Sequence, residues 1–271
     1  MCRWIAYTGP EIPMSLALIE AKHSLLVQSA HAELGAEPTN GDGFGVGWYS
    51  RHLSTPGVYR DVRPAWNDEN FRDVTAHIRS RMFLAHIRAT TGTAVQRSNC
   101  HPFRYGRWLF QHNGLIPDFF RLRRDLLFEI SGDFFDSIQG TTDSEIIFHL
   151  ALTYGLEDDP PAALARSIST VESLMDKHGV EGELQFSAAV ADGESIYAVR
   201  YANHGTPRTL FYATDLDVLK ELDPHLEAIP EGSIVVVSEP LGPALHWEEV
   251  PPGTLIRAGH GSVEVHPFGP A

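Results

Sequence analysis

The sequence predicts a mixed α and β fold with antiparallel sheets. Apolar residues alternate along short runs such as 44–48, which is typical of strands with one buried face. Other runs, such as 161–178, have the composition and stop signal of a helix. The dipeptide Asp192-Gly193 separates two strand-like runs and indicates a hairpin, which favours antiparallel pairing. We find no internal repeat and no linker, so we expect a single domain spanning residues 2–271.

Composition limits the class of protein. A chain of 271 residues at 43% hydrophobic content can bury a large core. Lys plus Arg is 21 and Asp plus Glu is 35, and the net charge of −14 disfavours nucleic acid or an anionic membrane as partner. No apolar run approaches membrane-spanning length and no signal peptide is evident, so we expect a soluble cytoplasmic protein. Two cysteines, Cys2 and Cys100, provide neither a disulfide framework nor a four-cysteine zinc site.

The first third of the chain is expected to begin with a strand over residues 2–8, which would hold Cys2 on a sheet. A short helix over 15–22 would be capped by its first residue, a serine. The Gly and Asp cluster at 40–43 indicates a turn before the strand at 44–48. Its glycines do not form a phosphate-binding loop, because no lysine follows in the required position and no helix opens there. Close approach of the backbone to another strand or a ligand is the better interpretation.

The following elements are read from the same signals. Residues 58–63 are expected to form a strand, and Asn67 is positioned to cap a helix over 68–79. Later in the chain we expect helices over 119–130, 142–155 and 161–178, and strands from Leu184 to the Asp192-Gly193 hairpin and beyond it, then over 209–214 and 233–238.

Cys2 is a candidate nucleophile. Initiator methionine is normally removed before a residue as small as cysteine, and the chain would then begin with a thiol and an α-amine on one residue. An amine of pKa about 7.7–8.0 beside a thiol of pKa about 8.5 can exchange a proton near neutral pH. The alternative is a cysteine that follows the start codon by chance.

Arg88 ends a buried apolar strand over 82–88. A planar guanidinium suits a carboxylate bound at two points, so Arg88 is a candidate substrate ligand. The alternative is a structural ion pair with one of the many acidic residues.

Asn113-Gly114 follows a strand over 108–112 and is a strong turn signal. The side-chain amide of Asn113 and the backbone N–H of Gly114 can also point at one oxygen, which is the donor pair that an oxyanion hole requires. An ordinary hairpin turn is the competing interpretation.

Asp143 lies in the capping-box pattern Thr142-Asp143-Ser144-Glu145, which precedes a helical run that Gly155 can end. Its carboxylate could bind a substrate ammonium. The alternative is that both acids serve only the helix N-terminus.

Taken together, these residues resemble the glutaminase domain of class II glutamine amidotransferases, which are N-terminal nucleophile hydrolases. The matching motifs occur in the family's order: Cys2, Ala85-His86-Ile87-Arg88, Cys100-His101-Pro102-Phe103, Gln111-His112-Asn113-Gly114 and Thr142-Asp143-Ser144-Glu145. Residues 23–29, 40–45 and 238–241 resemble the stand-alone branch, which includes the γ-glutamyl amidohydrolase of ergothioneine synthesis. The resemblance implies a four-layer αββα sandwich of two antiparallel sheets, with neither cofactor nor metal.

The resemblance also implies roles. Cys2 attacks the γ-carbonyl of glutamine or another γ-glutamyl amide, with its own α-amine as base. Asn113 and Gly114 hold the oxyanion, while Arg88 and Asp143 bind the α-carboxylate and α-ammonium. His101 would support the substrate site as part of its His-Pro-Phe motif. The site therefore requires the removal of Met1.

Several alternatives stay open. The chain could supply ammonia to a partner synthase, or it could sense a glutamyl ligand without turnover. A Cys100–His101 dyad is geometrically poor, because adjacent residues on a strand point to opposite faces. A metal site from His77, His86, His101 and His112 matches no ligand spacing that we can defend.

Overall fold

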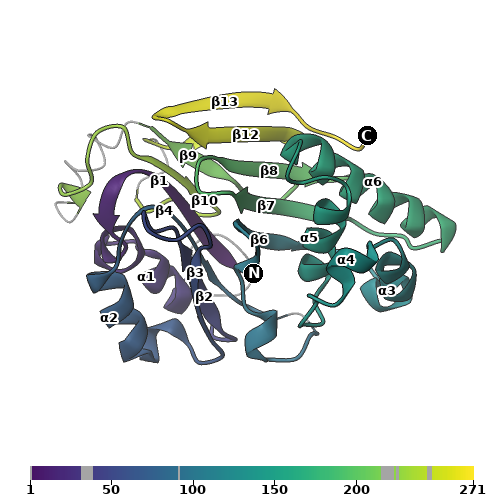
Figure 1. Ribbon diagram of the computed structural model, residues 1–271, viewed down its shortest axis with the longest axis horizontal. Helices are drawn as coiled ribbons and strands as arrows, with labels where there is room; N and C mark the ends of the chain where they lie inside the picture. Colours follow the sequence, from purple (N-terminus) through teal and green to yellow (C-terminus); the bar gives the residue numbers. More distant parts are fainter. Residues whose placement is uncertain (1, 32–38, 91, 215–222, 224–225, 243–245) are drawn as a thin grey trace.

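Two antiparallel sheets packed face to face form the centre of the structure (Figure 1). A computed structural model describes residues 2–31, 39–90, 92–214, 223, 226–242 and 246–271. In these residues the first sheet has seven strands, in the order β11-β9-β10-β1-β4-β2-β3. Its strands are β1 (Arg3–Pro13), β2 (Phe44–Trp48), β3 (Gly57–Asp61), β4 (Arg79–Ile87), β9 (Phe211–Ala213), β10 (Ile234–Val237) and β11 (Glu248–Glu249).

The second sheet has six strands over the same described ranges, in the order β13-β12-β8-β7-β6-β5. They are β5 (Phe103–Tyr105), β6 (Trp108–Leu115), β7 (Gln185–Ala191), β8 (Ile196–Ala202), β12 (Thr254–Gly259) and β13 (Ser262–Pro267). The Asp192-Gly193 hairpin between β7 and β8 is confirmed: Asp192 N donates to Ser195 O at 3.3 Å, and Gly193 has φ +93°.

An apolar core fills the space between the sheets. Trp4 and Leu84 from the first sheet pack in one cluster with Leu109, Ala189 and Ile256 from the second, and each side chain is at most 1% exposed. Apolar side chains here alternate with others that point to the outer faces, as strands buried on both sides require. The two sheets are therefore joined by burial of apolar surface.

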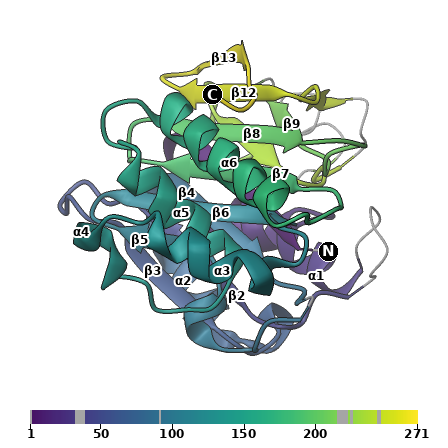
Figure 2. The ribbon, with the colours of Figure 1, turned by 90° about the vertical axis from the view of Figure 1, so that its right-hand side faces the viewer.

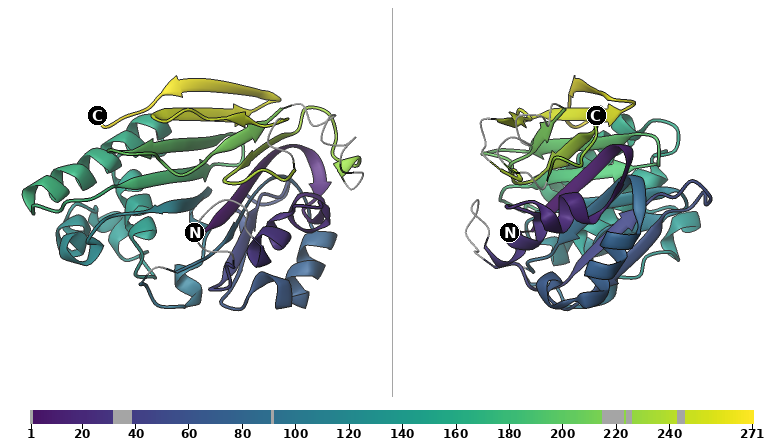
Figure 3. Two further views of the ribbon diagram at one scale, coloured as in Figure 1. Left: turned by 180° about the vertical axis from the view of Figure 1, so that it is seen from behind. Right: turned by 90° about the vertical axis from the view of Figure 1, so that its left-hand side faces the viewer.

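Helices cover both outer faces. Against the second sheet lie α3 (Phe119–Phe128), α4 (Gly132–Phe135), α5 (Asp143–Thr153) and α6 (Pro160–Lys177), as Figure 2 shows. Against the first sheet lie the π-helix η1 (Leu16–Glu20), α1 (Leu25–Ala30) and α2 (Glu69–His77), on the opposite side of the molecule (Figure 3). Two short 3₁₀ helices, η2 (Ala65–Asn67) and η3 (Arg97–Asn99), lie in connections. The predicted αββα sandwich is confirmed.

One turn prediction was wrong. Asn113 and Gly114 do not end the strand but continue β6, opposite Ser187 and Phe186 of β7. Glycine at position 114 allows Gln185 O and His112 Nε2 to lie close to the backbone, since a Cβ there would be 2.0 Å from both atoms. Pairing along β7 thus overrides the local turn preference of Asn-Gly.

Three capping predictions also need correction. The residue that caps α2 is Asp68, whose Oδ1 accepts from Phe71 N at 2.7 Å, while Asn67 ends η2. Ser15 donates to Glu20 Oε1 at 2.6 Å and does not cap η1. Thr142 does cap α5, but Glu145 accepts from the amides of residues 139 and 140 and does not return to Thr142. In each case another nearby hydrogen-bonding group takes the partner that the pattern predicted.

In the part of the chain that the structure describes, no helix is both long and apolar enough to cross a bilayer.

The helical layer on the second sheet should depend on Phe148. Its ring stacks on Phe110 of β6 with centroids 5.3 Å apart and an interplanar angle of 9°. Replacing Phe148 with Ala should lower the free energy of unfolding in urea by about 3–5 kcal/mol, because a large cavity remains.

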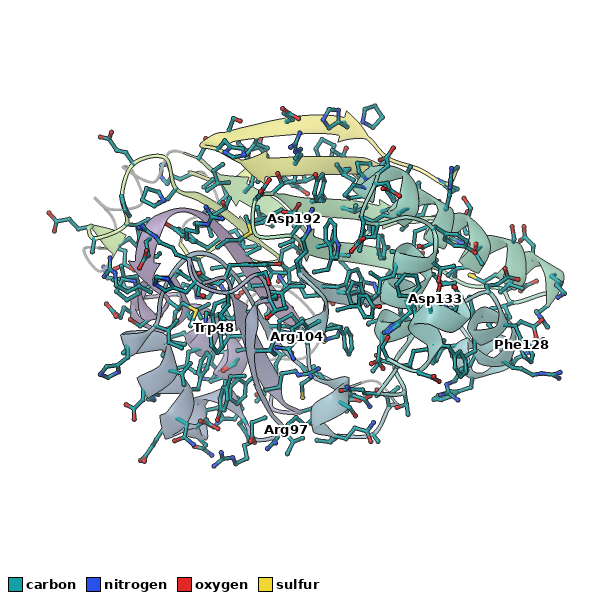
Figure 4. All side chains as sticks on the ribbon, viewed as in Figure 1. Trp48, Arg97, Arg104, Phe128, Asp133 and Asp192 are labelled. Atoms are coloured by element: carbon teal, nitrogen blue, oxygen red, sulfur yellow. The ribbon has the colours of Figure 1, made fainter. Side chains whose placement is uncertain are left out.

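Phe128→Ala is the matched control. Phe128 is 74% exposed at the outer edge of the helical layer (Figure 4). Its loss should change stability by about 0.5 kcal/mol or less. Equal losses in the two variants would contradict this account of the core.

Candidate active site

Strand pairing brings Cys2 beside the end of β4. Arg3 lies opposite Ile87 in the antiparallel register, so the residue before Arg3 meets the residues after Ile87. Accordingly, Cys2 Sγ lies 3.4 Å from both the backbone N and the backbone O of Ala89. Cys2 is partly buried. Its thiol lies next to Ala89, which directly follows Arg88, although 87 positions separate Cys2 from Ala89 in sequence.

Asn113 reaches Cys2 from the other sheet. Its Nδ2 donates to the Cys2 carbonyl oxygen at 2.9 Å, and Arg3 Nη1 donates to the same oxygen at 3.0 Å. A side-chain amide carries two N–H hydrogens, so one hydrogen of Asn113 remains for a further acceptor. Cys2, which precedes β1 of the first sheet, and the Asn113 amide of the second sheet therefore meet through a main-chain oxygen.

Arg88 is a buried cation held by neutral oxygens. Its side chain is 3% exposed, and its guanidinium donates to Thr93 Oγ1 at 2.6 Å, Thr90 Oγ1 at 3.2 Å and Asp42 O at 3.4 Å. The Asp42 carboxylate lies nearby but accepts from Thr90 N at 2.8 Å. Among the described residues no carboxylate forms an ion pair with Arg88, so the structural ion pair that we considered is not present there. A buried cation of this kind favours an external anion.

Asp143 links α5 to the end of β6. Its Oδ2 accepts from Ile116 N at 3.0 Å, two residues beyond Gly114, and its Oδ1 accepts from Ser144 N at 2.8 Å. The Ser144 hydroxyl lies 2.9 Å from His112 Nδ1. The start of α5 is thus tied to the strand that carries Asn113, and Asp143 serves this local structure in addition to any role with a ligand.

His101 lies in a buried stack of rings. Its ring centroid is 4.1 Å from that of His86 and 4.6 Å from that of Phe103. Burial lowers the pKa of His86 to about 3 and holds the pKa of His101 well below its usual range, and the neighbouring His86, His112 and Arg88 add to the effect on His101. These rings are neutral at physiological pH. Within the described residues the ring nitrogens of His101 have no hydrogen-bond partner, so it packs beside the site.

The two competing sites are not assembled. Cys100 is fully buried, and its thiol donates to the carbonyl oxygens of Asp61 and Gln96 at 3.4 and 3.6 Å. The described residues contain no group of three His, Cys, Asp or Glu side chains suited to a metal ion.

The surroundings of the Cys2 thiol favour its protonated form. Burial raises the pKa of Cys2, while the hydrogen bond with Ala89 and the positive charges of Arg88 and Arg3 act in the opposite direction without cancelling it. A nucleophilic Cys2 therefore needs a base. Met1, whose removal would expose the α-amine of Cys2, lies outside the described residues.

Sequence reasoning missed several polar partners. It did not assign roles to Asp42, Thr93, Arg3 or Glu239, although Asp42 and Glu239 fall within motifs 40–45 and 238–241. No sequence pattern predicts that a threonine hydroxyl will accept a hydrogen bond from a guanidinium. Membership of those two motifs was the available signal.

Comparison with known proteins decides the family. The profile described as "Glutamine amidotransferases class-II" matches residues 19–268. The chain belongs to this family. It is 32% identical to the probable glutamine amidotransferase DUG3 of Saccharomyces cerevisiae over 99% of this chain and 84% of the relative. It is 28% identical to the gamma-glutamyl-hercynylcysteine sulfoxide hydrolase of Mycolicibacterium smegmatis over 99% of this chain and all of the relative.

Solved structures agree with this class II amidotransferase fold. A glutamine aminotransferase class-II domain protein from Silicibacter pomeroyi matches with a TM-score of 0.74 and 34% identity, over 99% of this chain and 100% of the other. The glutamine phosphoribosylpyrophosphate amidotransferase of Bacillus subtilis matches with a TM-score of 0.62 and 14% identity, over 98% of this chain and 49% of the other. The second likeness concerns the fold alone.

The neutral His101 ring has a consequence for stability. The unfolded chain binds a proton at histidine below pH about 6.5, whereas burial prevents His101 from binding it in the folded chain. Stability is therefore lost as pH falls below that value. In His101→Phe the unfolding free energy should drop by about 1–2 kcal/mol less than in the wild type between pH about 7 and about 5. Urea titrations at the two pH values measure this difference, and equal drops would contradict it.

Proposed function

We propose that this class II amidotransferase hydrolyses the γ-amide bond of glutamine or a γ-glutamyl metabolite through a thioester on Cys2. One observation carries the proposal. Arg88, whose buried guanidinium is held by neutral oxygens, directly precedes Ala89, and the backbone of Ala89 contacts the Cys2 thiol. A binding point for an anion thus adjoins a nucleophile, as a substrate with an α-carboxylate and a reactive γ-carbonyl requires.

The chemistry needs the α-amine of Cys2, which removal of Met1 would expose. The amine takes the thiol proton, directly or through one water, and Sγ attacks the γ-carbonyl carbon. When the tetrahedral intermediate collapses, the leaving amine takes the proton and departs, leaving a γ-glutamyl thioester. Water, deprotonated by the same amine, then attacks the thioester, and the thiol recovers its proton as glutamate leaves.

Asn113 is the proposed oxyanion donor. One of its amide hydrogens is directed at Cys2 O, which fixes the amide plane and leaves the second hydrogen for the developing charge. Gly114 N–H is the second proposed donor, and no larger residue fits at this position. Loss of one such donor typically costs about 2.7–4 kcal/mol of transition-state stabilisation.

The proposed clamp on the glutamyl group has two ends. Arg88 would bind the α-carboxylate with a charge-assisted, two-point interaction, and Asp143 would bind the α-ammonium. His101 makes no side-chain hydrogen bond among the described residues and would support the end of β4, directly before Arg88, by packing on His86.

One relative supports hydrolysis, and another supports ammonia transfer. The mycobacterial relative, aligned over its whole length, is named as a hydrolase of a γ-glutamyl compound. The yeast relative is named a probable glutamine amidotransferase, which keeps an ammonia-supplying function with a partner enzyme as the second candidate.

Covalent trapping tests the nucleophile. Intact mass of the purified chain should show loss of Met1, and a glutamine-like diazoketone should add one adduct on Cys2. Cys2→Ala should take up no adduct, because the thiol that would be alkylated is absent.

Cys100→Ala is the matched control and should keep the adduct, since Cys100 is sealed in the core. An adduct on Cys100, or no adduct on a chain that has lost Met1, would contradict the mechanism. Glutamate release from several γ-glutamyl amides separates the enzyme from a ligand sensor, which would bind without release. Release from glutamine alone would favour the ammonia-supplying function.

A substrate pair tests Arg88. In Arg88→Met, kcat/KM for a γ-glutamyl anilide should fall about 10- to 150-fold, because a charge-assisted hydrogen bond contributes about 1.5–3 kcal/mol. For the analogue that lacks the α-carboxylate, the same variant should lose little. The ratio of the two substrates within one variant cancels any change in the folded fraction.

Arg104→Met is the control, since Arg104 lies exposed on β5 (Figure 4) and donates to Pro56 O. It should leave both substrates unchanged. Equal losses on both substrates in Arg88→Met would refute the carboxylate contact.

A further inference from the structure

Glu239 is carried to the nucleophile by the pairing of β10 with β1. Val237 lies opposite Ile5, and beyond this pair Ser238 N donates to Trp4 O at 3.0 Å. Ser238 Oγ accepts from Trp4 N at 2.9 Å. The next residue, Glu239, therefore lies beside Arg3, although 236 positions separate them in sequence.

The Glu239 carboxylate is buried and held at both oxygens. Its Oε2 lies 2.5 Å from Arg3 Nε, with the two side chains 2% and 3% exposed, and its Oε1 lies 3.0 Å from His23 Nε2. The Gln28 amide donates to the carbonyl oxygens of Glu239 and Pro240 at 3.3 and 3.2 Å. The motifs 23–29 and 238–241, to which no chemistry had been attached, thus meet at this carboxylate.

Arg3, which Glu239 holds in place, in turn contacts Cys2. Its Nη1 donates to Cys2 O, the oxygen that also accepts from Asn113 Nδ2. A continuous path of contacts runs from Glu239 through Arg3 and the Cys2 carbonyl to Asn113. The orientation of the amide therefore depends on where that carbonyl is held.

We propose that Glu239 is a positioning residue of the active site, which acts through Arg3 to fix the Cys2 carbonyl and the plane of the Asn113 amide. The negative charge of Glu239 also offsets the positive field of Arg3 at the Cys2 thiol. The proposal rests on the proposed function for its kinetic part. Its electrostatic part concerns the thiol alone and can be measured without turnover.

The sign of the electrostatic effect follows from the charges. Arg3 and Arg88 lower the pKa of the Cys2 thiol against the larger effect of burial. Removal of the negative charge beside Arg3 strengthens the positive field, which favours the thiolate and disfavours an ammonium. The pKa values of the thiol and of the Cys2 α-amine should therefore both fall. The other charged and titratable groups on the facing elements stay in place: Arg88 after β4, His23 before α1, His112 on β6 and Asp143 on α5.

Glu239→Gln removes the charge and keeps the shape. We expect kcat for γ-glutamyl amide hydrolysis to fall about tenfold or more with little change in KM, because Arg88 and Asp143 are untouched. The midpoint pH of Cys2 alkylation by iodoacetamide should fall by about half a unit, which makes alkylation about threefold faster at pH about 6. A purely structural role would not move this midpoint.

Two variants serve as controls. Glu239→Asp keeps the charge but shortens the side chain, so it should lower kcat while leaving the alkylation midpoint near that of the wild type. Glu11→Gln makes the same chemical change near the far end of β1, where Glu11 pairs with Arg51 at 3.0 Å, roughly 30 Å from Cys2 along the strand. It should change neither quantity. Intact mass and thermal melting verify loss of Met1 and folding for every variant.

A folded Glu239→Gln variant with the wild-type kcat and alkylation midpoint would overturn this inference while leaving the proposed function standing. If the wild type releases no glutamate, the proposed function fails, and the alkylation midpoints still decide the role of Glu239. If Glu239→Gln does not fold, Glu239→Asp decides, since a wild-type kcat in that variant rules out positioning.

Discussion

The register of β1 against its two neighbours is the constraint on which the site depends. Pairing with β4 sets Cys2 beside Ala89, and pairing with β10 sets Arg3 beside Glu239. Trp4 packs between the sheets, and Tyr7 on the other face stacks on Phe83 with centroids 4.9 Å apart. A shift by one residue would exchange these faces. The packing that stabilises the sheet therefore also enforces the alignment of the polar groups at its end.

Much of the fold could be predicted because its signals are local. Alternation of apolar residues marked β2, and Gly155 and Gly179 marked the ends of α5 and α6, where both adopt positive φ. The errors arose where distant partners decide. Asn113-Gly114 has the composition of a turn, but β7, which begins some seventy residues later, keeps it extended. No window of sequence around Asn113 contains that information.

The site divides in the same way. Cys2, Arg88, Asn113 and Asp143 belong to short motifs in a characteristic order, so sequence alone could nominate them. The roles of their supporting residues could not be assigned from sequence, because each role depends on a tertiary contact. The Thr93 hydroxyl accepts a hydrogen bond from Arg88, and Glu239 forms an ion pair with Arg3 although most of the chain separates them in sequence. Short motifs therefore identify the proposed catalytic and binding residues more readily than the residues that support them.

The division of the site between two sheets has a further consequence. Cys2 directly precedes β1 of the first sheet, and Asn113 lies on the second, so the two come within reach of each other only when the sheets are packed together. Under the proposed mechanism, a partly folded chain with one sheet formed would hold a thiol without an oxyanion donor, or a donor without a thiol. Hydrolysis through both groups would therefore require the two sheets to be packed together.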